Sequence, residues 1–296
     1  MGKESHTPYS LLHTVYSTRN TMLITITTDF GTRDGYVGTM KGVIAGIALD
    51  VLCIDITQEI PPQDVRSAAY VLWTALPYFP PESIHIVVVD PGVGTARRPI
   101  AARTSWGTLV GPDNGVFSYV WEAASPTRIV ELANPAYRNV AVSSTFHGRD
   151  IFSPAAAHLA RGVLLDEFGP EVTDPVRLPA PILTVTESVI AGEVIYIDHF
   201  GNIITSIGRL VWDGTLLSLD PAFGDAPGGI INAGRVRVIA AGRDLGPVRR
   251  TYGEVAPGEP LALVGSEGLL ELAVNRGHGV QALGLQIGDR VQIALR

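Results

Sequence analysis

The chain has 296 residues, of which 46% are hydrophobic and 17% charged, a composition typical of globular proteins and not of disordered ones. Its net charge of −7 and the absence of a long lysine and arginine cluster argue against a nucleic-acid partner. The single cysteine, Cys53, excludes an intrachain disulfide and any zinc or iron–sulfur site built on several thiolates.

No apolar run is long enough to cross a membrane, and the first residues lack the apolar core of a signal peptide. We therefore expect a cytoplasmic protein. Residues 1–21 follow no clear pattern, so we expect a flexible N-terminal tail there.

From residue 22 the chain alternates strand-like and helix-like segments. Apolar runs indicate strands at residues 22–30, 51–56, 83–90, 99–104, 107–113 and 128–134. Helices are predicted at residues 35–48, 64–79, about 114–124 and 153–162. Ser153 followed by Pro154 is a typical N-cap and first-turn pair, so Ser153 is expected to cap the last helix. This order predicts an α/β sandwich with a mostly parallel sheet over residues 22–176.

A proline-rich segment follows, and residues 177–187 are predicted to be a linker. Beyond it the segments are short, β-branched and separated by glycine and proline, which is typical of an all-β domain. Residues 188–296 are therefore expected to form a barrel-like C-terminal domain.

Ionisable side chains gather at three predicted strand ends. They are Asp29 and Asp34 in TTDFGTRDGY, Asp90, Arg97 and Arg98 in DPGVGTARR, and His147, Arg149 and Asp150 in STFHGRDIFSP. Ligands of open α/β sheets bind beyond the carboxyl ends of the strands, so Asp29 and Asp90 are expected to share one edge. Taken singly, each aspartate is also a common turn residue.

The C-terminal half adds two polar segments. They are IDHFGNIITSI, with Asp198 and Asn202, and VGSEGLLELAVNRG, with Ser266, Glu267 and Asn275. Read in isolation, the Asp198 segment is equally well explained as a hairpin turn, and Asn275-Arg276-Gly277 is better explained as a turn than as a site.

Several common catalytic motifs are absent from the sequence. It contains no Walker A motif, dinucleotide-binding glycine pattern, Gly-x-Ser-x-Gly elbow or His-Glu-x-x-His pair. Asp29, Asp90, His147 and Asp150 could hold a divalent metal, but no two of them have close ligand spacing. A metal-dependent phosphoesterase is therefore a secondary alternative, and no metal or cofactor is expected.

Read together, the segments resemble a known family, the S-adenosyl-L-methionine (SAM) hydroxide adenosyltransferases. These are adenosine-forming SAM hydrolases related to the fluorinase and chlorinase. The resemblance covers residues 22–296 and includes TTDFGTRDGYVGTMKGVI, VVVDPGVGTARRPIA, GPDNGVFS, STFHGRDIFSPAAAHLA, YIDHFGNIITSI and GSEGLLELAVNRG.

The resemblance implies an N-terminal α/β domain, a C-terminal β-barrel and a homotrimer, sometimes a dimer of trimers. It implies a substrate held between the N-terminal domain of one subunit and the C-terminal domain of the next. It maps a catalytic triad onto Asp90, Arg97 and His147. The implied reaction is metal-free, in-line attack of water on the ribose C5′ of SAM, with Arg97 holding the water and His147 accepting its proton.

The same resemblance assigns the substrate contacts. It matches Asp29 to the ribose hydroxyls and places Asp34 and Tyr36 on the same loop. It matches Asp198 and Ser266 to the methionine amino end. It matches Asn202 and the backbone around Asn275 to the adenine, with Phe200 packed on the base. At Glu267 the halogenating relatives carry an arginine that pairs with the methionine carboxylate, which a glutamate cannot do.

Two alternatives remain on the same scaffold. The first is a chlorinase-like halogenase, although the fluorinase has a tyrosine where Asp90 lies and a threonine where Val93 lies. The second is a protein that binds SAM or adenosine without turnover. The full triad favours water as the nucleophile.

Overall fold

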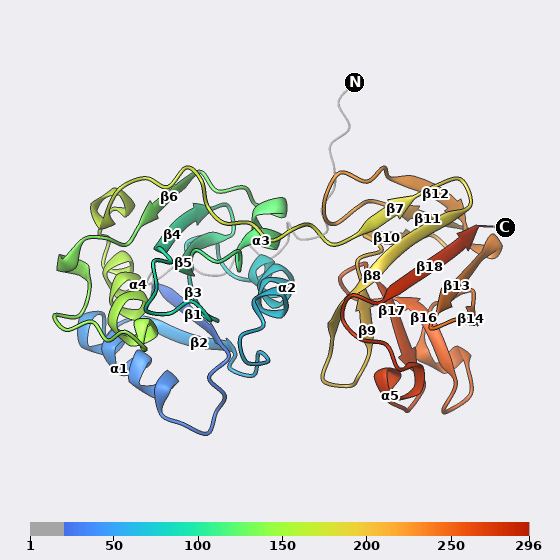
Figure 1. The fold of residues 1–296 in the computed structure, drawn as a ribbon, viewed down its shortest axis with the longest axis horizontal. Helices are drawn as coiled ribbons and strands as arrows, with labels where there is room; N and C mark the ends of the chain where they lie inside the picture. Colours follow the sequence, from blue (N-terminus) through green and yellow to red (C-terminus); the bar gives the residue numbers. More distant parts are fainter. Residues whose placement is uncertain (1–20, 296) are drawn as a thin grey trace.

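The computed structural model describes residues 21–295, which form two lobes joined by an extended segment (Figure 1). The tail expected at residues 1–21 lies, apart from Thr21, outside the described residues. The predicted domain boundaries stay predictions, although the expected linker already contains a short strand, β7 (Leu183–Val185).

The N-terminal lobe is built on a six-stranded sheet of order β2-β1-β3-β5-β4-β6. Its strands are β1 (Leu23–Thr28), β2 (Leu52–Thr57), β3 (Ile84–Val88), β4 (Pro99–Thr104), β5 (Gly107–Pro112) and β6 (Arg128–Glu131). Strands β2, β1, β3 and β5 are parallel, and β4 is antiparallel to β5 and β6. The predicted α/β class with a mostly parallel sheet is confirmed.

Helices cover both faces of this sheet. One face carries α1 (Tyr36–Ile47) and α4 (Ser153–Ala160), and the face toward the C-terminal lobe carries α2 (Val65–Ala75) and α3 (Ser118–Ala123) (Figure 1). Side chains of β3 alternate between the two cores: Ile86 and Val88 pack toward α1 and α4, and Val87 packs toward α2 and α3. Because both faces are buried, the strand is apolar except for His85, whose buried Nδ1 lies 2.8 Å from Thr25 Oγ1.

The start of α4 differs from the prediction. A π-helical turn, η3 (Gly148–Phe152), leads directly into α4, so the backbone is already helical before Ser153. Ser153 Oγ is buried and has no hydrogen-bond partner among residues 21–295. The expected N-cap role of Ser153 is therefore wrong, because no open first turn exists there for a side chain to cap.

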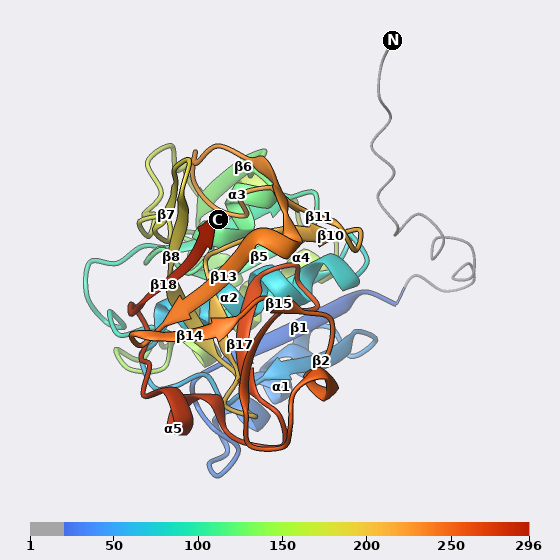
Figure 2. The same ribbon diagram turned by 90° about the vertical axis from the view of Figure 1, so that its right-hand side faces the viewer.

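The C-terminal lobe is almost entirely β-structure. A nine-stranded sheet has the order β14-β13-β18-β8-β9-β17-β16-β15, with β7 added to β8, and β10-β11-β12 form a small second sheet. The remaining bounds are β8 (Val189–Ile197), β9 (Ile203–Thr205), β10 (Leu210–Trp212), β11 (Leu216–Leu219), β12 (Gly229–Asn232), β13 (Val236–Ala240), β14 (Arg243–Gly246), β15 (Val248–Arg249), β16 (Pro260–Val264), β17 (Leu270–Val274), β18 (Arg290–Leu295) and α5 (Gly279–Leu283). Figure 2 shows this lobe from its outer side, with β8 beside β18. The expected barrel-like all-β architecture is confirmed.

Helix α2 connects the two lobes. Arg66 Nη1 donates to Glu193 Oε1 of β8 at 3.2 Å, and the ring of Tyr70 stacks on that of Tyr196 with centroids 4.5 Å apart. These contacts bury a second face of α2, which explains why its sequence is apolar around most of the helix.

Arg98 holds the segment that leaves the N-terminal lobe. Its Nε donates to Asp113 Oδ2 at 2.9 Å, and its Nη1 donates to Asp174 Oδ1 at 2.7 Å. Asp113 Oδ1 in turn accepts from the backbone N–H of Val176 at 2.8 Å. Arg98 is thus a structural neighbour of Arg97 with its own partners.

None of the helices in residues 21–295 has the length and apolar character needed to span a membrane.

Candidate active site

Asp90 and Arg97 form a buried ion pair beyond the carboxyl end of β3. Arg97 Nε donates to Asp90 Oδ1 at 3.1 Å, and Arg97 Nη2 donates to Asp90 Oδ2. Their side chains are only 6% and 4% exposed, respectively. Two parallel N–H···O bonds fix the guanidinium in one plane and one orientation. The turn between the two residues brings them into contact although they are seven positions apart in the sequence.

His147 is the third member of this cluster, contributed by a loop 50 residues further along the chain. Its Nδ1 lies 3.0 Å from Arg97 Nη2. Because arginine has donors and no acceptor, Nδ1 must accept this hydrogen bond, and the ring proton of the neutral imidazole is on Nε2. The triad implied by the resemblance is therefore in direct contact.

Burial sets the protonation of the cluster. It lowers the pKa of His147, and the positive charge of Arg97 lowers that pKa further. Burial raises the pKa of Asp90, while the Arg97 guanidinium opposes that rise. At neutral pH we therefore assign a neutral imidazole beside a charge-balanced Asp90–Arg97 pair.

One donor of Arg97 is unused. Its Nη1 is buried and has no hydrogen-bond partner in the described part of the chain. The guanidinium carbon lies 5.4 Å from the ring centroid of Phe152 in η3, so an aromatic face covers one side. A buried N–H without an acceptor costs about 1–3 kcal/mol, so this donor marks a place for an oxygen atom.

The turn after Asp90 packs closely against the loop that carries His147. Gly94 has a φ of +75°, and a Cβ at this position would collide with the carbonyl oxygen of Ser144. Only glycine combines this backbone angle with so close an approach. The Gly-Val-Gly turn therefore lets Arg97 and His147 meet.

Asp29 follows β1, the strand next to β3, where Thr28 pairs with Val88. It therefore shares the sheet edge of Asp90, as the strand pattern predicts. Its Oδ2 accepts from the backbone N–H of Gln63 at 2.7 Å. Gln63 has a φ of +67°, a strained conformation for a residue other than glycine. Sequence reasoning missed Gln63, since nothing in PPQD marks it.

Asp34 and Tyr36 lie at the loop that follows Asp29. Asp34 is exposed, and Tyr36 is half exposed. The rings of Tyr36 and Phe146 are 5.3 Å apart, and that of Phe30 is 5.9 Å from Phe146. These aromatic contacts hold the Asp29 loop against the residue that precedes His147.

In the C-terminal lobe, Asp198 and Asn202 organise a turn. Asp198 Oδ1 accepts from the backbone N–H groups of Phe200 and Asn202 at 2.9 and 2.8 Å, and its Oδ2 accepts from Asn202 Nδ2 at 2.9 Å. The turn exposes the Phe200 ring, which is 72% accessible. Asn275 Nδ2 donates to the carbonyl of Val255 at 2.7 Å, which closes a neighbouring loop. Their roles toward adenine and the amino end stay predictions.

Ser266 and Glu267 line a second, smaller site. Ser266 Oγ donates to Glu267 Oε1 at 3.3 Å, and both border a cavity of about 30 Å³ shared with Tyr70 and Glu271. Sequence reasoning missed Tyr70 and Glu271, although the two-sided apolar pattern of the helix over residues 64–79 is a signal for Tyr70. No hydrogen bond, ion pair or ring contact within residues 21–295 joins this group to the Asp90 cluster.

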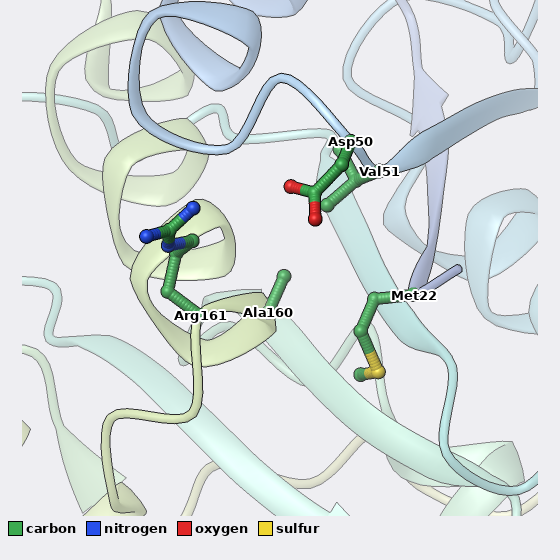
Figure 3. A pocket seen from close by; sticks show the side chains of 5 residues that line it. All are labelled: Met22, Asp50, Val51, Ala160 and Arg161. Atoms are coloured by element: carbon green, nitrogen blue, oxygen red, sulfur yellow. The ribbon is translucent and has the colours of Figure 1, made fainter. Parts of the chain in front are cut away.

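A larger cavity of about 260 Å³ lies elsewhere in the N-terminal lobe (Figure 3). Met22 and Val51 precede β1 and β2, and Ala160 and Arg161 end α4, so this cavity lies at the amino ends of the strands. It is therefore at the sheet edge opposite Asp29 and Asp90.

The residues of the metal alternative are not assembled into one site. Asp150 is buried, and its carboxylate accepts from Asn139 Nδ2, from the Ser143 backbone and from Arg149. Across residues 21–295, no three His, Cys, Asp or Glu side chains come together as a metal-binding group.

Comparisons with known proteins show the family to which the chain belongs. Family models of the SAM hydroxide adenosyltransferase N-terminal and C-terminal domains match residues 24–169 and 192–292. An (R)-S-adenosyl-L-methionine hydrolase of Thermus thermophilus is 45% identical over 274 residues, covering 90% of this chain and 96% of the relative.

Two further similarities extend the comparison. A fluorinase of Actinopolyspora mzabensis is 28% identical, covering 92% of this chain and 96% of the relative. A crystal structure of an uncharacterized conserved protein from Thermotoga maritima has a TM-score of 0.79 and 35% identity, covering 92% of this chain and 99% of the other.

Proposed function

Since this chain belongs to the SAM hydroxide adenosyltransferase family, we propose that it hydrolyses SAM to adenosine and L-methionine. The observation that carries the proposal is the buried Arg97 guanidinium, held by Asp90 and His147 with Nη1 left free. That arrangement suits an enzyme that must fix one oxygen nucleophile.

The chemistry requires little beyond this alignment. The water oxygen forms a bond to C5′ of the ribose while the C5′–S bond breaks, and the electron pair leaves with the sulfur of methionine. A sulfonium leaves as a neutral thioether, so no general acid, metal or cofactor is needed. The contribution of the protein is to orient the water in line with the C–S bond and to exclude other water.

Arg97 and His147 have different roles toward the attacking water. Arg97 Nη1 donates to the attacking oxygen and stabilises the hydroxide character that develops on it. His147 accepts the proton, which its lowered pKa allows because the ring is neutral at working pH. In the structure His147 Nδ1 accepts a hydrogen bond from Arg97 Nη2. To take the proton, Nδ1 must exchange this hydrogen bond for one from the attacking water.

Substrate binding would complete the site from a second subunit. We assign Asp29 to the ribose hydroxyls, and Asp198, Asn202, Phe200 and the Ser266 turn to the remainder of SAM. No hydrogen bond, ion pair or ring contact within residues 21–295 joins these two groups, and Phe200 and Tyr36 expose aromatic rings. A cytoplasmic homotrimer in which each C-terminal lobe meets the neighbouring Asp90 cluster accounts for both observations.

The test is chromatography of the purified protein incubated with SAM and a chelator, with and without high chloride, in isotopically labelled water. Adenosine carrying the label, with methionine, is expected in both salts. A chloride-dependent chloronucleoside would instead make the protein a halogenase. Unchanged SAM that still raises the melting temperature would make it a binding protein.

A further inference from the structure

The cavity of about 260 Å³ in the N-terminal lobe lies at one end of a hydrophobic core (Figure 3). Its apolar lining consists of Met22, Val51 and Ala160, and all three are partly buried side chains that pack on the core between the sheet, α1 and α4. An apolar group placed on this lining would extend the core and release water from it. The cavity therefore offers a binding surface for an apolar group.

Two charged side chains complete the lining. Asp50, from the turn before β2, and Arg161, directly after α4, reach toward the cavity from two sides (Figure 3). Neither side chain forms a hydrogen bond or an ion pair with another residue among 21–295. The Asp50 carboxylate thus keeps its acceptors, and the Arg161 guanidinium keeps its fork of donors, for a ligand.

The opposite signs of these two charges indicate the charge of the ligand. A phosphate or another polyanion would be repelled by Asp50, and a cation such as SAM would be repelled by Arg161. A ligand with an ammonium and a carboxylate close together can pair with both side chains. The planar guanidinium of Arg161 also matches the geometry of a carboxylate. The lining therefore favours a zwitterion.

The volume of the cavity sets the size of the ligand. Cavities for drug-sized ligands measure about 300–1,000 Å³, so this cavity takes a smaller molecule. An apolar cavity of about 150 Å³ holds a molecule the size of benzene. A free amino acid with an apolar side chain of about four heavy atoms lies between these limits.

We propose that this cavity is a second ligand site, which binds a free α-amino acid with an apolar side chain. The ammonium of the ligand pairs with Asp50, its carboxylate pairs with Arg161, and its side chain packs on the apolar lining. The site lies at the sheet edge opposite the Asp90 cluster, so it is separate from the proposed active site and does not depend on the proposed function. The ligand class includes L-methionine.

Methionine side chains of the protein supply a direct test. Met22 lines the cavity, whereas Met40 is buried near the triad, where its sulfur lies 3.0 Å from the position that a Cβ on Gly148 would occupy. With carbon-13 in the methionine methyl groups, the NMR signal of Met22 reports on the cavity, and that of Met40 reports on the active site. The variants Met22→Leu and Met40→Leu assign the two signals.

The probe is L-norleucine, a zwitterion with a four-carbon side chain that is not a product of the proposed reaction. It should shift the Met22 signal with a dissociation constant of about 1 mM and leave the Met40 signal in place. Pentylamine, hexanoate and glycine are norleucine without its carboxylate, its ammonium and its apolar side chain, respectively. Each should bind about fivefold more weakly or worse.

Variants of the two charges locate the binding. Asp50→Asn and Arg161→Gln should each weaken norleucine binding about fivefold or more, because each removes one ion pair with the ligand. The matched controls are Asp225→Asn and Arg103→Gln, which change exposed residues outside the cavity. Both controls should leave the Met22 titration unchanged.

Several results would overturn the proposal. One is a Met22 signal that stays in place at norleucine concentrations about tenfold above 1 mM. Another is equal affinity for norleucine, pentylamine and hexanoate, or unchanged affinity in Asp50→Asn and Arg161→Gln. A shift of the Met40 signal alone would place the amino acid in the active site instead. Because the titration needs no turnover, its outcome is independent of whether the protein hydrolyses SAM.

Discussion

Replacement of Arg97 by lysine separates the positive charge of the guanidinium from its geometry. Arginine uses Nε and Nη2 on Asp90 and Nη2 on His147, and keeps Nη1 for the nucleophile. Lysine keeps the charge but concentrates its donors on one atom at the end of a flexible chain. It can pair with Asp90 but cannot also hold His147 and an oxygen in a fixed plane.

The expected loss is that of one preorganised donor to a developing oxyanion. Removing such a donor lowers kcat about 100- to 1,000-fold, or about 2.7–4 kcal/mol of transition-state stabilisation. KM for SAM should change little, because Arg97 contacts the water and not the substrate in the proposed mechanism. Steady-state adenosine release measures both constants.

Arg98→Lys is the matched control, since it makes the same substitution one residue later. Arg98 pairs with Asp113 and Asp174, so its replacement should lower stability and leave kcat within about threefold of the unaltered enzyme. If Arg97→Lys kept more than a fifth of kcat, or if Arg98→Lys lost as much activity, the assignment of Arg97 would be refuted.

Three further predictions concern the loops around this cluster. In the unaltered enzyme kcat should fall only at acid pH, below the ordinary range of histidine, because burial and the Arg97 charge lower the pKa of His147 and the ring must be neutral to act. His147→Ala should lose this acid limb together with about 100-fold or more of kcat. Unchanged turnover across pH in His147→Ala would move the base to Asp90. Hydrogen bonds from Arg149, Ser143 and Asn139 lower the pKa of the buried Asp150 to about 2, so this carboxylate stabilises the fold above about pH 4 and the benefit is lost as pH falls toward 2. Asp150→Asn should therefore lower the unfolding free energy by about 2 kcal/mol at pH 7 in urea titrations, with little effect at pH 2. Equal losses at both pH values would contradict this. Gly94→Ala should impair activity more than stability, because its Cβ meets Ser144 and separates the Arg97 turn from the His147 loop, and an active Gly94→Ala enzyme would show that this approach is not needed.

The local hydrophobic pattern of the sequence was sufficient to predict most of the fold. The apolar run ending at Asp90 is a strand buried on both faces, as Ile86 and Val87 show by packing into different cores. The same reasoning failed at Ser153, where Ser-Pro is a common helix start. A π turn is not encoded in that dipeptide, so the helix begins earlier than the capping rule allows.

The candidate site was predictable to different degrees. Asp29 and Asp90 follow from strand ends of one parallel sheet. The contact between Arg97 and His147 spans 50 residues and followed from the family resemblance, since no spacing rule encodes it. Tyr70 and Glu271 meet across two lobes, and such a meeting depends on how the lobes pack. The hydrophobic pattern of the helix over residues 64–79 shows that a second face of the helix is buried. It does not show which part of the protein covers that face.

The adjacency of Arg97 and Arg98 has a consequence for modular exchange. One side chain belongs to the reactive cluster, and the next anchors Asp174, where the chain leaves the lobe. A chimera that takes its C-terminal lobe from a relative must therefore join downstream of Val176, so that both anchors of Arg98 stay native. A junction placed earlier would exchange Asp174 and remove one anchor of Arg98, so such a hybrid should lose stability while its kcat changes as little as that of Arg98→Lys.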